Sequence, residues 1–277
     1  MIPRFLRISI LTAALAASVG RGSDAGDDQP KLGLQTWTCR NMNFDQVVAF
    51  AVQHHLKYLE MIAAHVDPLG PKEESLRKKA VLEKNGLVMY SFGVNKTSLD
   101  KEENRKLFEF ARLMGIKLII VEPGDVAIWD NLEELAKEYD IKVAVHNHNL
   151  NSPYGNPMTV QAVLHHRDPR LGVCLDVGWA TAAGWDAAKV FKEYEGRVFD
   201  IHFKDKVVKW ADGKPAPEDT LIGQGQANYA GLFAAIKQSG WSGVMAIETD
   251  SNEFAKDPGR LIDEARKYFD ASLAAAR

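Results

Sequence analysis

Short apolar runs alternate with longer amphipathic stretches along most of the chain. A run of about four to eight apolar residues, many of them β-branched, is typical of a buried strand, whereas apolar residues at every third or fourth position indicate a helix with one buried face. The pattern predicts eight strands, at residues 32–37, 58–62, 88–94, 118–123, 142–149, 172–178, 198–205 and 244–250. It predicts helices near residues 43–55, 73–84, 99–114, 131–139, 158–166 and 185–194, then one that ends near 238 and one from 259 to the C-terminus.

Turn and cap residues separate these elements. Asn43 precedes the first helix as a predicted N-cap, and Asn85-Gly86 and Gly115 follow helices at the position where a left-handed residue is favoured. The longest segment without a predicted element, residues 206–227, contains three glycines and two prolines. We expect this segment to be a loop, because both residue types interrupt regular structure.

Eight strands that alternate with helices predict an α/β protein whose parallel sheet is connected by helical crossovers. The simplest such arrangement is a closed (β/α)8 TIM barrel, and a single domain over residues 26–277 has the usual length for it. A doubly wound open sheet is the alternative. The strand-to-helix turns contain no Gly-x-Gly-x-x-Gly or Walker-type phosphate loop, so the closed barrel is favoured.

The first 25 residues have the layout of a secretory signal peptide. Arg4 and Arg7 precede an apolar run from Ile8 to about Val19, and small and polar residues follow. We expect cleavage between about Ala17 and Gly26 and a soluble periplasmic or secreted protein, because no later segment is long and apolar enough to insert into a membrane.

Composition limits the kind of partner. A formal net charge of -3 offers no basic surface for nucleic acid or anionic lipid, so we expect a small-molecule ligand and leave open a homo-oligomer. Two cysteines, Cys39 and Cys174, are too few for a disulfide framework.

Four of the predicted strands end in side chains that can bind a metal. The fifth ends in His146 and His148, which alternation along a strand would place on one face. The sixth, seventh and eighth end in Asp176, His202 and Glu248. Alone, each is explained better as a cap or a paired polar group than as a metal ligand. Together, at the end of a barrel that carries active sites, they predict one divalent metal ion, Mn, Mg, Co or Zn, held by nitrogen and oxygen donors.

Three of these strand ends carry a family resemblance. GVCLDVG around Asp176, DIHFKD around His202 and AIETD around Glu248 resemble the xylose isomerase-like TIM-barrel superfamily of sugar phosphate isomerases and epimerases. The resemblance covers nearly all of the chain after the leader. It implies that these three residues bind one divalent cation together with a carboxylate from the fifth strand.

The fifth strand departs from that pattern. His146 stands where sugar epimerases of the family usually have a glutamate that is both a ligand and one of two opposed catalytic carboxylates. Either His146 takes the ligand role and leaves His148 as a catalytic base or supporting group, or His148 is the ligand. Trp179 also replaces a family histidine and offers an aromatic face to a sugar.

Further residues near strand ends are candidates for catalysis or substrate binding. Glu122 is a possible base or ligand, although it could equally stabilise a helix N-terminus. Lys204 could neutralise a developing oxyanion or simply pair with Asp205 or Glu248. The candidate substrate-binding residues are Gln35, Trp37, Glu60, His65 and Trp179, with Trp210 in the long loop.

We therefore expect a divalent-metal-dependent isomerase or epimerase that moves a proton next to the carbonyl of a non-phosphorylated sugar or glycoside. Loss of one family carboxylate raises an alternative within the same family, a lyase or hydratase of keto-sugars or 3-keto-glycosides, which could work with a single base. A second alternative is a periplasmic sugar-binding protein without catalysis. The acidic balance and the export signal argue against a nuclease, which would need more metal-binding histidines and a basic groove.

Overall fold

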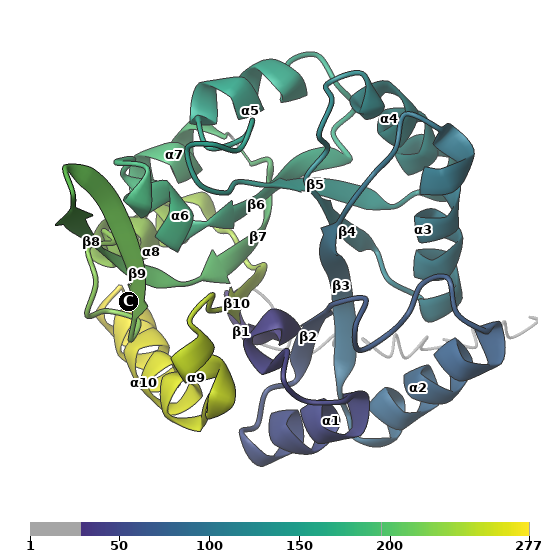
Figure 1. Ribbon diagram of the computed structural model, residues 1–277, viewed down its shortest axis with the longest axis horizontal. Helices are drawn as coiled ribbons and strands as arrows, with labels where there is room; N and C mark the ends of the chain where they lie inside the picture. The colour runs from purple at the N-terminus through teal and green to yellow at the C-terminus, as the bar shows by residue number, and fades with distance from the viewer. Residues whose placement is uncertain (1–28, 195, 277) are drawn as a thin grey trace, which may run out of the picture.

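A computed structural model describes residues 29–194 and 196–276, which form a closed barrel of eight parallel strands surrounded by helices (Figure 1). Around the barrel the strands follow the order β1-β10-β7-β6-β5-β4-β3-β2. The strands are β1 (Lys31–Gln35), β2 (Tyr58–Met61), β3 (Val88–Asn95), β4 (Leu118–Val121), β5 (Lys142–His146), β6 (Leu171–Asp176), β7 (Val198–Phe203) and β10 (Val244–Ile247). The predicted single-domain TIM barrel is confirmed, and the open sheet is excluded.

Helices cover the outside of the barrel. They are α1 (Phe44–Gln53), α2 (Lys72–Lys84), α3 (Lys101–Met114), α4 (Ile128–Tyr139), α5 (Pro157–Leu164), α6 (Val177–Ala182), α7 (Ala187–Glu193), α8 (Tyr229–Ser239), α9 (Asn252–Lys256) and α10 (Gly259–Ala275), with a short 3-10 helix η1 at Thr36–Cys39. Local chemistry sets their ends. The predicted cap Asn43 accepts the backbone N–H of Gln46 and is part of a capping box, and Gly115 closes α3 in the left-handed conformation.

Apolar side chains pack in two separate regions. The larger region fills the layer between the strands and the helices. The smaller one lies inside the barrel and consists of Leu118, Ile120, Ala144 and Cys174, with Tyr90 and Phe199 against it. Buried polar side chains, among them Glu60 and Asp200, occupy other interior positions. The inside of this barrel is therefore only partly a hydrophobic core.

The prediction of a loop over residues 206–227 is wrong for the first part of that segment. Residues 205–220 form an antiparallel hairpin of β8 (Asp205–Ala211) and β9 (Lys214–Thr220), and β8 packs on α6. Asp212 and Gly213 connect the strands, both at positive φ, as a tight two-residue turn requires. The two prolines that favoured a loop lie on β9. A strand paired on only one side tolerates proline, because half of its N–H groups face away from the partner strand.

Asp205 holds the base of this hairpin. Its buried carboxylate accepts backbone N–H groups from Lys206, Gly223, Gly225 and Ala227. Any side chain at Gly225 would collide with that carboxylate. Asp205 therefore ties the segment after the hairpin back to the end of β7, and it is not the ion-pair partner of Lys204 that the sequence left open.

The predicted signal peptide, residues 1–25, lies outside the described residues, so export stays a prediction. Among the helices of the described part of the chain, none has the length and apolar character that a membrane span needs.

We predict that Asp205→Ala lowers the free energy of unfolding by about 3 kcal/mol, because it leaves the buried N–H of Lys206 and the N–H groups of Gly223, Gly225 and Ala227 without their acceptor. Urea denaturation measures the loss. Glu218→Gln, on the exposed side of β9, is the matched control and should change stability by less than about 0.5 kcal/mol. Equal stability of the two variants would contradict the anchoring role.

Candidate active site and metal centre

Four predicted side chains meet at the C-terminal end of the barrel. His146 ends β5, Asp176 ends β6, His202 lies on β7 and Glu248 follows β10, and these four strands are neighbours in the barrel. Asp176 Oδ2 lies 3.4 Å from His146 Nε2 and 3.6 Å from His202 Nδ1. One donor atom from each of these three residues lies within 4.8 Å of the others. The strand alternation that points them inward thus produces a compact N,O,N group.

The hydrogen bonding of these side chains is incomplete. His146 Nδ1, Asp176 Oδ2, His202 Nδ1 and Glu248 Oε2 are buried and make no hydrogen bond, although three of them take part in ion pairs. Buried polar atoms in proteins are normally paired. Two imidazole nitrogens and two carboxylate oxygens with free lone pairs are a donor set that suits Zn, Mn or Co. The residues present therefore fit a divalent ion.

Lys204 provides the positive charge of the site. Its buried ammonium lies 3.0 Å from Asp176 Oδ2 and 2.9 Å from Asp250 Oδ2, and it contacts Glu248 Oε2. The ion pair with Glu248 that the sequence offered as one possibility is present. Gly178 makes room for this lysine, because a Cβ at that position would lie 2.7 Å from Lys204 Cγ.

Two of the three carboxylates beside Lys204, those of Asp176 and Glu248, differ in acidity. Burial alone would raise the pKa of Asp176, but Lys204 and the histidines at 146 and 202 hold that pKa well below its usual range. Burial raises the pKa of Glu248 above its usual range, and the opposing charge of Lys204 does not reverse the shift. Neighbouring carboxyl groups with divergent pKa values are typical of acid–base sites.

A second lysine extends the charge network to the hairpin. Lys206 is buried, pairs with Asp219 of β9 and lies 3.2 Å from Asp250 Oδ2. Its ammonium also lies 3.8 Å from the centre of the Trp179 ring. The sequence analysis missed Lys206, Asp219 and Asp250. The alternation in Lys204-Asp205-Lys206 could have indicated the second lysine, but Asp219 lay in a segment taken for a loop.

His148 lies outside the metal group. Its Nδ1 is 3.7 Å from Glu122 Oε2, its ring meets the Trp179 ring edge-on at 4.8 Å between centroids, and 38% of its side chain is exposed. Ser152 donates its hydroxyl to the other oxygen of Glu122. The rings of His146 and His148 lie close together, 5.7 Å apart between centroids, although β5 ends at His146. Of the two, His146 is the one grouped with Asp176 and His202.

The predicted substrate-binding residues fall into two groups. Gln35, Glu60 and His65 are buried and bonded within the protein, so they present almost no surface. His65 bonds to Thr36 and to the carbonyl of Met42. Trp37 is 43% exposed, Trp210 at the hairpin is 74% exposed and Trp179 is partly exposed. These three tryptophans keep an accessible aromatic surface.

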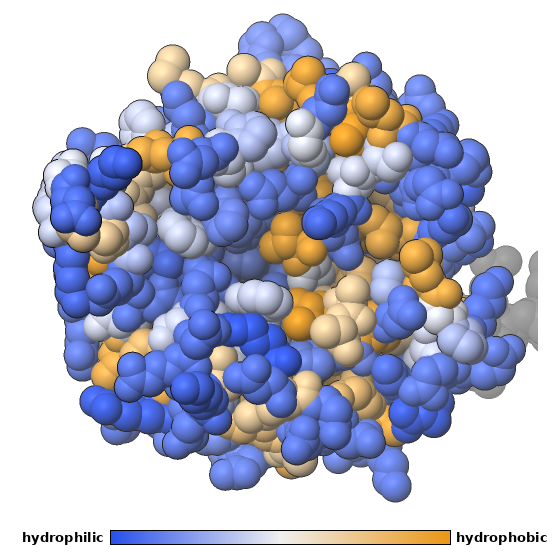
Figure 2. Space-filling model, in the orientation of Figure 1, coloured by the Kyte–Doolittle hydropathy of each residue, from blue (hydrophilic) through white to orange (hydrophobic). Residues whose placement is uncertain are grey.

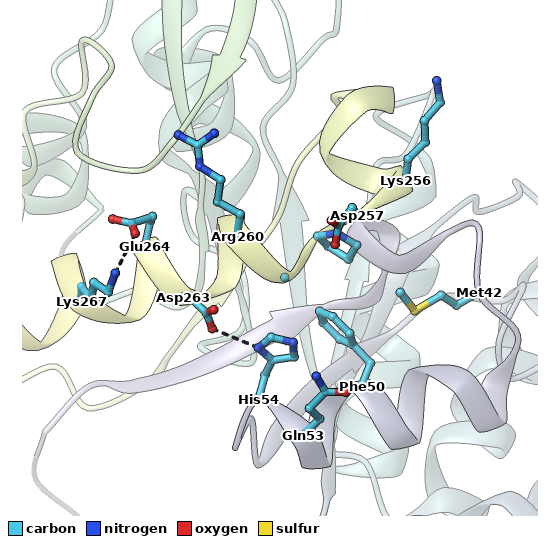
Figure 3. A pocket seen from close by; sticks show the side chains of 12 residues that line it. Met42, Phe50, Gln53, His54, Lys256, Asp257, Arg260, Asp263, Glu264 and Lys267 are labelled. Carbon is cyan, nitrogen blue, oxygen red and sulfur yellow. Dashed lines mark hydrogen bonds and ion pairs between the residues drawn. The ribbon is translucent and has the colours of Figure 1, made fainter.

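The molecular surface around the barrel end is uneven. Figure 2 shows a hollow over the centre of the barrel, bordered mainly by hydrophilic residues on one side and by hydrophobic ones on the other. A separate hollow of about 510 Å³ lies on the outside, between α1 and the α9–α10 segment, where His54 pairs with Asp263 (Figure 3). It contains none of the predicted site residues.

Comparisons with known proteins agree with this geometry. Residues 46–272 match a family model described as xylose isomerase-like TIM barrel. The chain is 24% identical to an inosose dehydratase of Lacticaseibacillus casei, with 89% of this chain and 93% of that protein covered. Two solved structures share the fold. The IolI protein with a bound zinc atom has a TM-score of 0.74 at 17% identity, with 89% of this chain and 99% of IolI covered. A probable 3-DHS dehydratase, AsbF, from Bacillus anthracis has a TM-score of 0.69 at 16% identity, with 86% and 98% covered.

We predict that the protein binds about one divalent ion per chain and that His146→Ala weakens the Kd by more than about 100-fold, beyond the 10–100-fold typical of losing a supporting residue. His148→Ala is the matched control and should retain the ion. Metal analysis and chelator competition measure both. The assignment fails if His148→Ala, and not His146→Ala, empties the site.

Proposed function

Because the chain belongs to the xylose isomerase-like TIM-barrel family, we propose that it is a divalent-metal-dependent lyase of keto-sugars or keto-glycosides. The proposed reaction removes a proton next to a carbonyl and expels water or an alcohol from the neighbouring carbon. The main observation behind this proposal is that His146 replaces one of the two opposed family carboxylates. A separate accessible base, His148, lies beside Glu122. Similarity to proteins named as dehydratases supports the same reaction class.

The proposed metal site consists of His146, Asp176, His202 and Glu248. A bound divalent ion would act as a Lewis acid on the substrate carbonyl oxygen. Lys204 would stabilise the negative charge that develops on that oxygen, because its buried ammonium lies beside the same carboxylates and is shielded from water.

His148 is the proposed base. The carboxylate of Glu122 near Nδ1 favours a proton on that nitrogen and leaves the lone pair of Nε2 for the substrate. His148 takes the proton from carbon, the electrons of the C–H bond form the new C=C bond, and the bond to the leaving oxygen breaks. The leaving oxygen recovers the proton and departs as water or an alcohol. A single base on one face of the substrate is sufficient for this sequence.

An isomerase or epimerase, the function that the sequence analysis favoured, is the second candidate. Epimerisation needs one group on each face of the sugar to remove and return the proton. Glu248 is present for one face, and its raised pKa suits a proton donor. Glu248, however, contacts Lys204, and the carboxylate that would face it from the other side of the sugar is missing. The site therefore suits elimination with His148 as the base better than epimerisation with Glu248.

We further propose a non-phosphorylated substrate encountered outside the cytoplasm. The two buried lysines of the site, Lys204 and Lys206, are both paired with carboxylates, so neither is available to bind a phosphate group. The signal-peptide pattern in residues 1–25 supports export. Three accessible tryptophans suit the apolar faces of a sugar ring or glycoside.

We predict that the manganese-loaded protein converts a keto-glycoside into an unsaturated keto-sugar and a free alcohol. NMR in deuterium oxide distinguishes this from epimerisation. Exchange of the proton for deuterium with no loss of water or alcohol would count against the lyase.

We predict that His148→Ala lowers kcat by about 10²–10⁴-fold, the usual range for a general acid–base group, while the bound metal is retained. His165→Ala, at the end of α5 and outside the site, is the matched histidine control and should keep full activity. A His148→Ala enzyme as active as this control would exclude His148 as the base.

A further inference from the structure

Glu60 connects two distant strands inside the barrel. It lies on β2, is fully buried and faces His202 on β7, which is not adjacent to β2. Glu60 Oε2 lies 3.1 Å from His202 Nε2, and Glu60 Oε1 accepts a hydrogen bond of 3.0 Å from Gln35 Nε2. Asp200 also lies against the Glu60 carboxylate, so its partners are all side chains of the protein.

The orientation of the Gln35 amide is determined by its other bonds. Its Nε2 also donates to the carbonyl of Gly93 at 3.0 Å, and its Oε1 accepts the backbone N–H of Trp37 at 2.6 Å. The amide nitrogen, not the oxygen, must consequently face Glu60. The carboxylate between Gln35 and His202 has to act as an acceptor on both sides.

This arrangement determines which nitrogen of His202 carries the proton. An ionised carboxylate only accepts hydrogen bonds, so Nε2 of His202 has to be the N–H donor. In the neutral imidazole, the form that can bind a metal, Nδ1 then keeps its lone pair. It is buried, makes no hydrogen bond and lies 3.6 Å from Asp176 Oδ2, on the side of the proposed metal.

A layer of side chains closes the space around Glu60. Tyr90 donates its hydroxyl to Asp200 Oδ1 at 2.9 Å, and Cys174 Sγ lies 3.7 Å from Asp200 Oδ2. Glu60, Cys174, Asp200 and His202 are all buried and close enough to hold an ion in principle. Their bonds to one another and to Tyr90 already satisfy most of their polar atoms, so a packed polar layer explains this group without a second metal.

We infer that Glu60 is a positioning residue that fixes the ring and the tautomer of His202, so that Nδ1 and not Nε2 binds the metal. The inference rests on the proposed metal-dependent function and deepens it. It also assigns Glu60 a role other than the substrate contact that its place near a strand end suggested. Carboxylates that bind the outer nitrogen of a metal-bound histidine commonly contribute to metal affinity in this way.

Glu60→Gln tests the inference with almost no change of shape. Because Gln35 presents its N–H groups, the new amide must turn its oxygen to Gln35 and its NH2 to His202. The amide then donates to Nε2 and forces the imidazole proton onto Nδ1, where it competes with the metal. We expect the Kd for Zn²⁺, measured by chelator competition, to weaken by about 10–100-fold.

Tyr90→Phe is the matched control for damage to the interior. It removes a buried hydrogen bond from the same layer without touching the Glu60–His202 pair. We expect a lower thermal midpoint with an unchanged Kd for Zn²⁺. Equal weakening of Zn²⁺ binding in Tyr90→Phe and Glu60→Gln would assign Glu60 a structural role only and overturn the inference.

A measurement on the unaltered protein keeps the inference testable if Glu60→Gln does not fold. In ¹⁵N NMR of the Zn²⁺-loaded, histidine-labelled protein, His202 should show zinc on Nδ1 and a proton on Nε2. Zinc on Nε2 would overturn the inference and leave the metal-dependent function standing. Failure of the unaltered protein to bind Zn²⁺, Mn²⁺ or Co²⁺ would instead overturn the proposed function, and the inference with it.

Discussion

The ammonium group of Lys204 is the interaction on which the rest of the site depends. Asp176 and Glu248 are buried at the barrel end, and an isolated buried carboxylate carries a large desolvation cost. Lys204 contacts both of them and also Asp250, so one cation balances three carboxylates that come from two different strand ends. Lys206 and Asp219 extend this alternation of charge into the hairpin. The geometry of the proposed metal donors is thus coupled to a segment outside the barrel.

The barrel itself was predictable because each strand is a short apolar run that needs cover on both faces, and because helices of regular length separate the runs. The inward direction of Asp176 and His202 follows from the same alternation. Which of the neighbouring imidazoles of His146 and His148 reaches Asp176 does not follow from it, since β5 stops pairing at His146. The β8–β9 hairpin was not predicted because its second strand contains two prolines, which usually indicate a loop. Proline is tolerated there because β9 pairs with another strand on one side only.

The contacts of the site that the sequence did not predict join residues that are far apart in the chain. Glu60 and His202 are 142 positions apart, and nothing in the run around Glu60 indicates a histidine partner. Asp250 was visible at a strand end, but its role depends on two lysines, Lys204 after the end of β7 and Lys206 on β8. The polar barrel interior is a similar case. Burial and the charge of Glu60 raise the pKa of Asp200 well above its usual range, so this carboxyl has properties that its sequence neighbours do not reveal.

The two ends of the β8–β9 hairpin differ in how they contact the rest of the protein. Asp205, Lys206 and Asp219 at the base are bonded to the site and to the following segment, whereas residues 209–215 project into solvent and support no buried contact. Substitutions or insertions at the tip can therefore accumulate without disturbing the charges that hold the carboxylates. Related proteins can therefore differ at the hairpin tip while they keep the same residues at the barrel end. Residues 209–215 are accordingly the region to vary when the protein is redesigned for a different ligand.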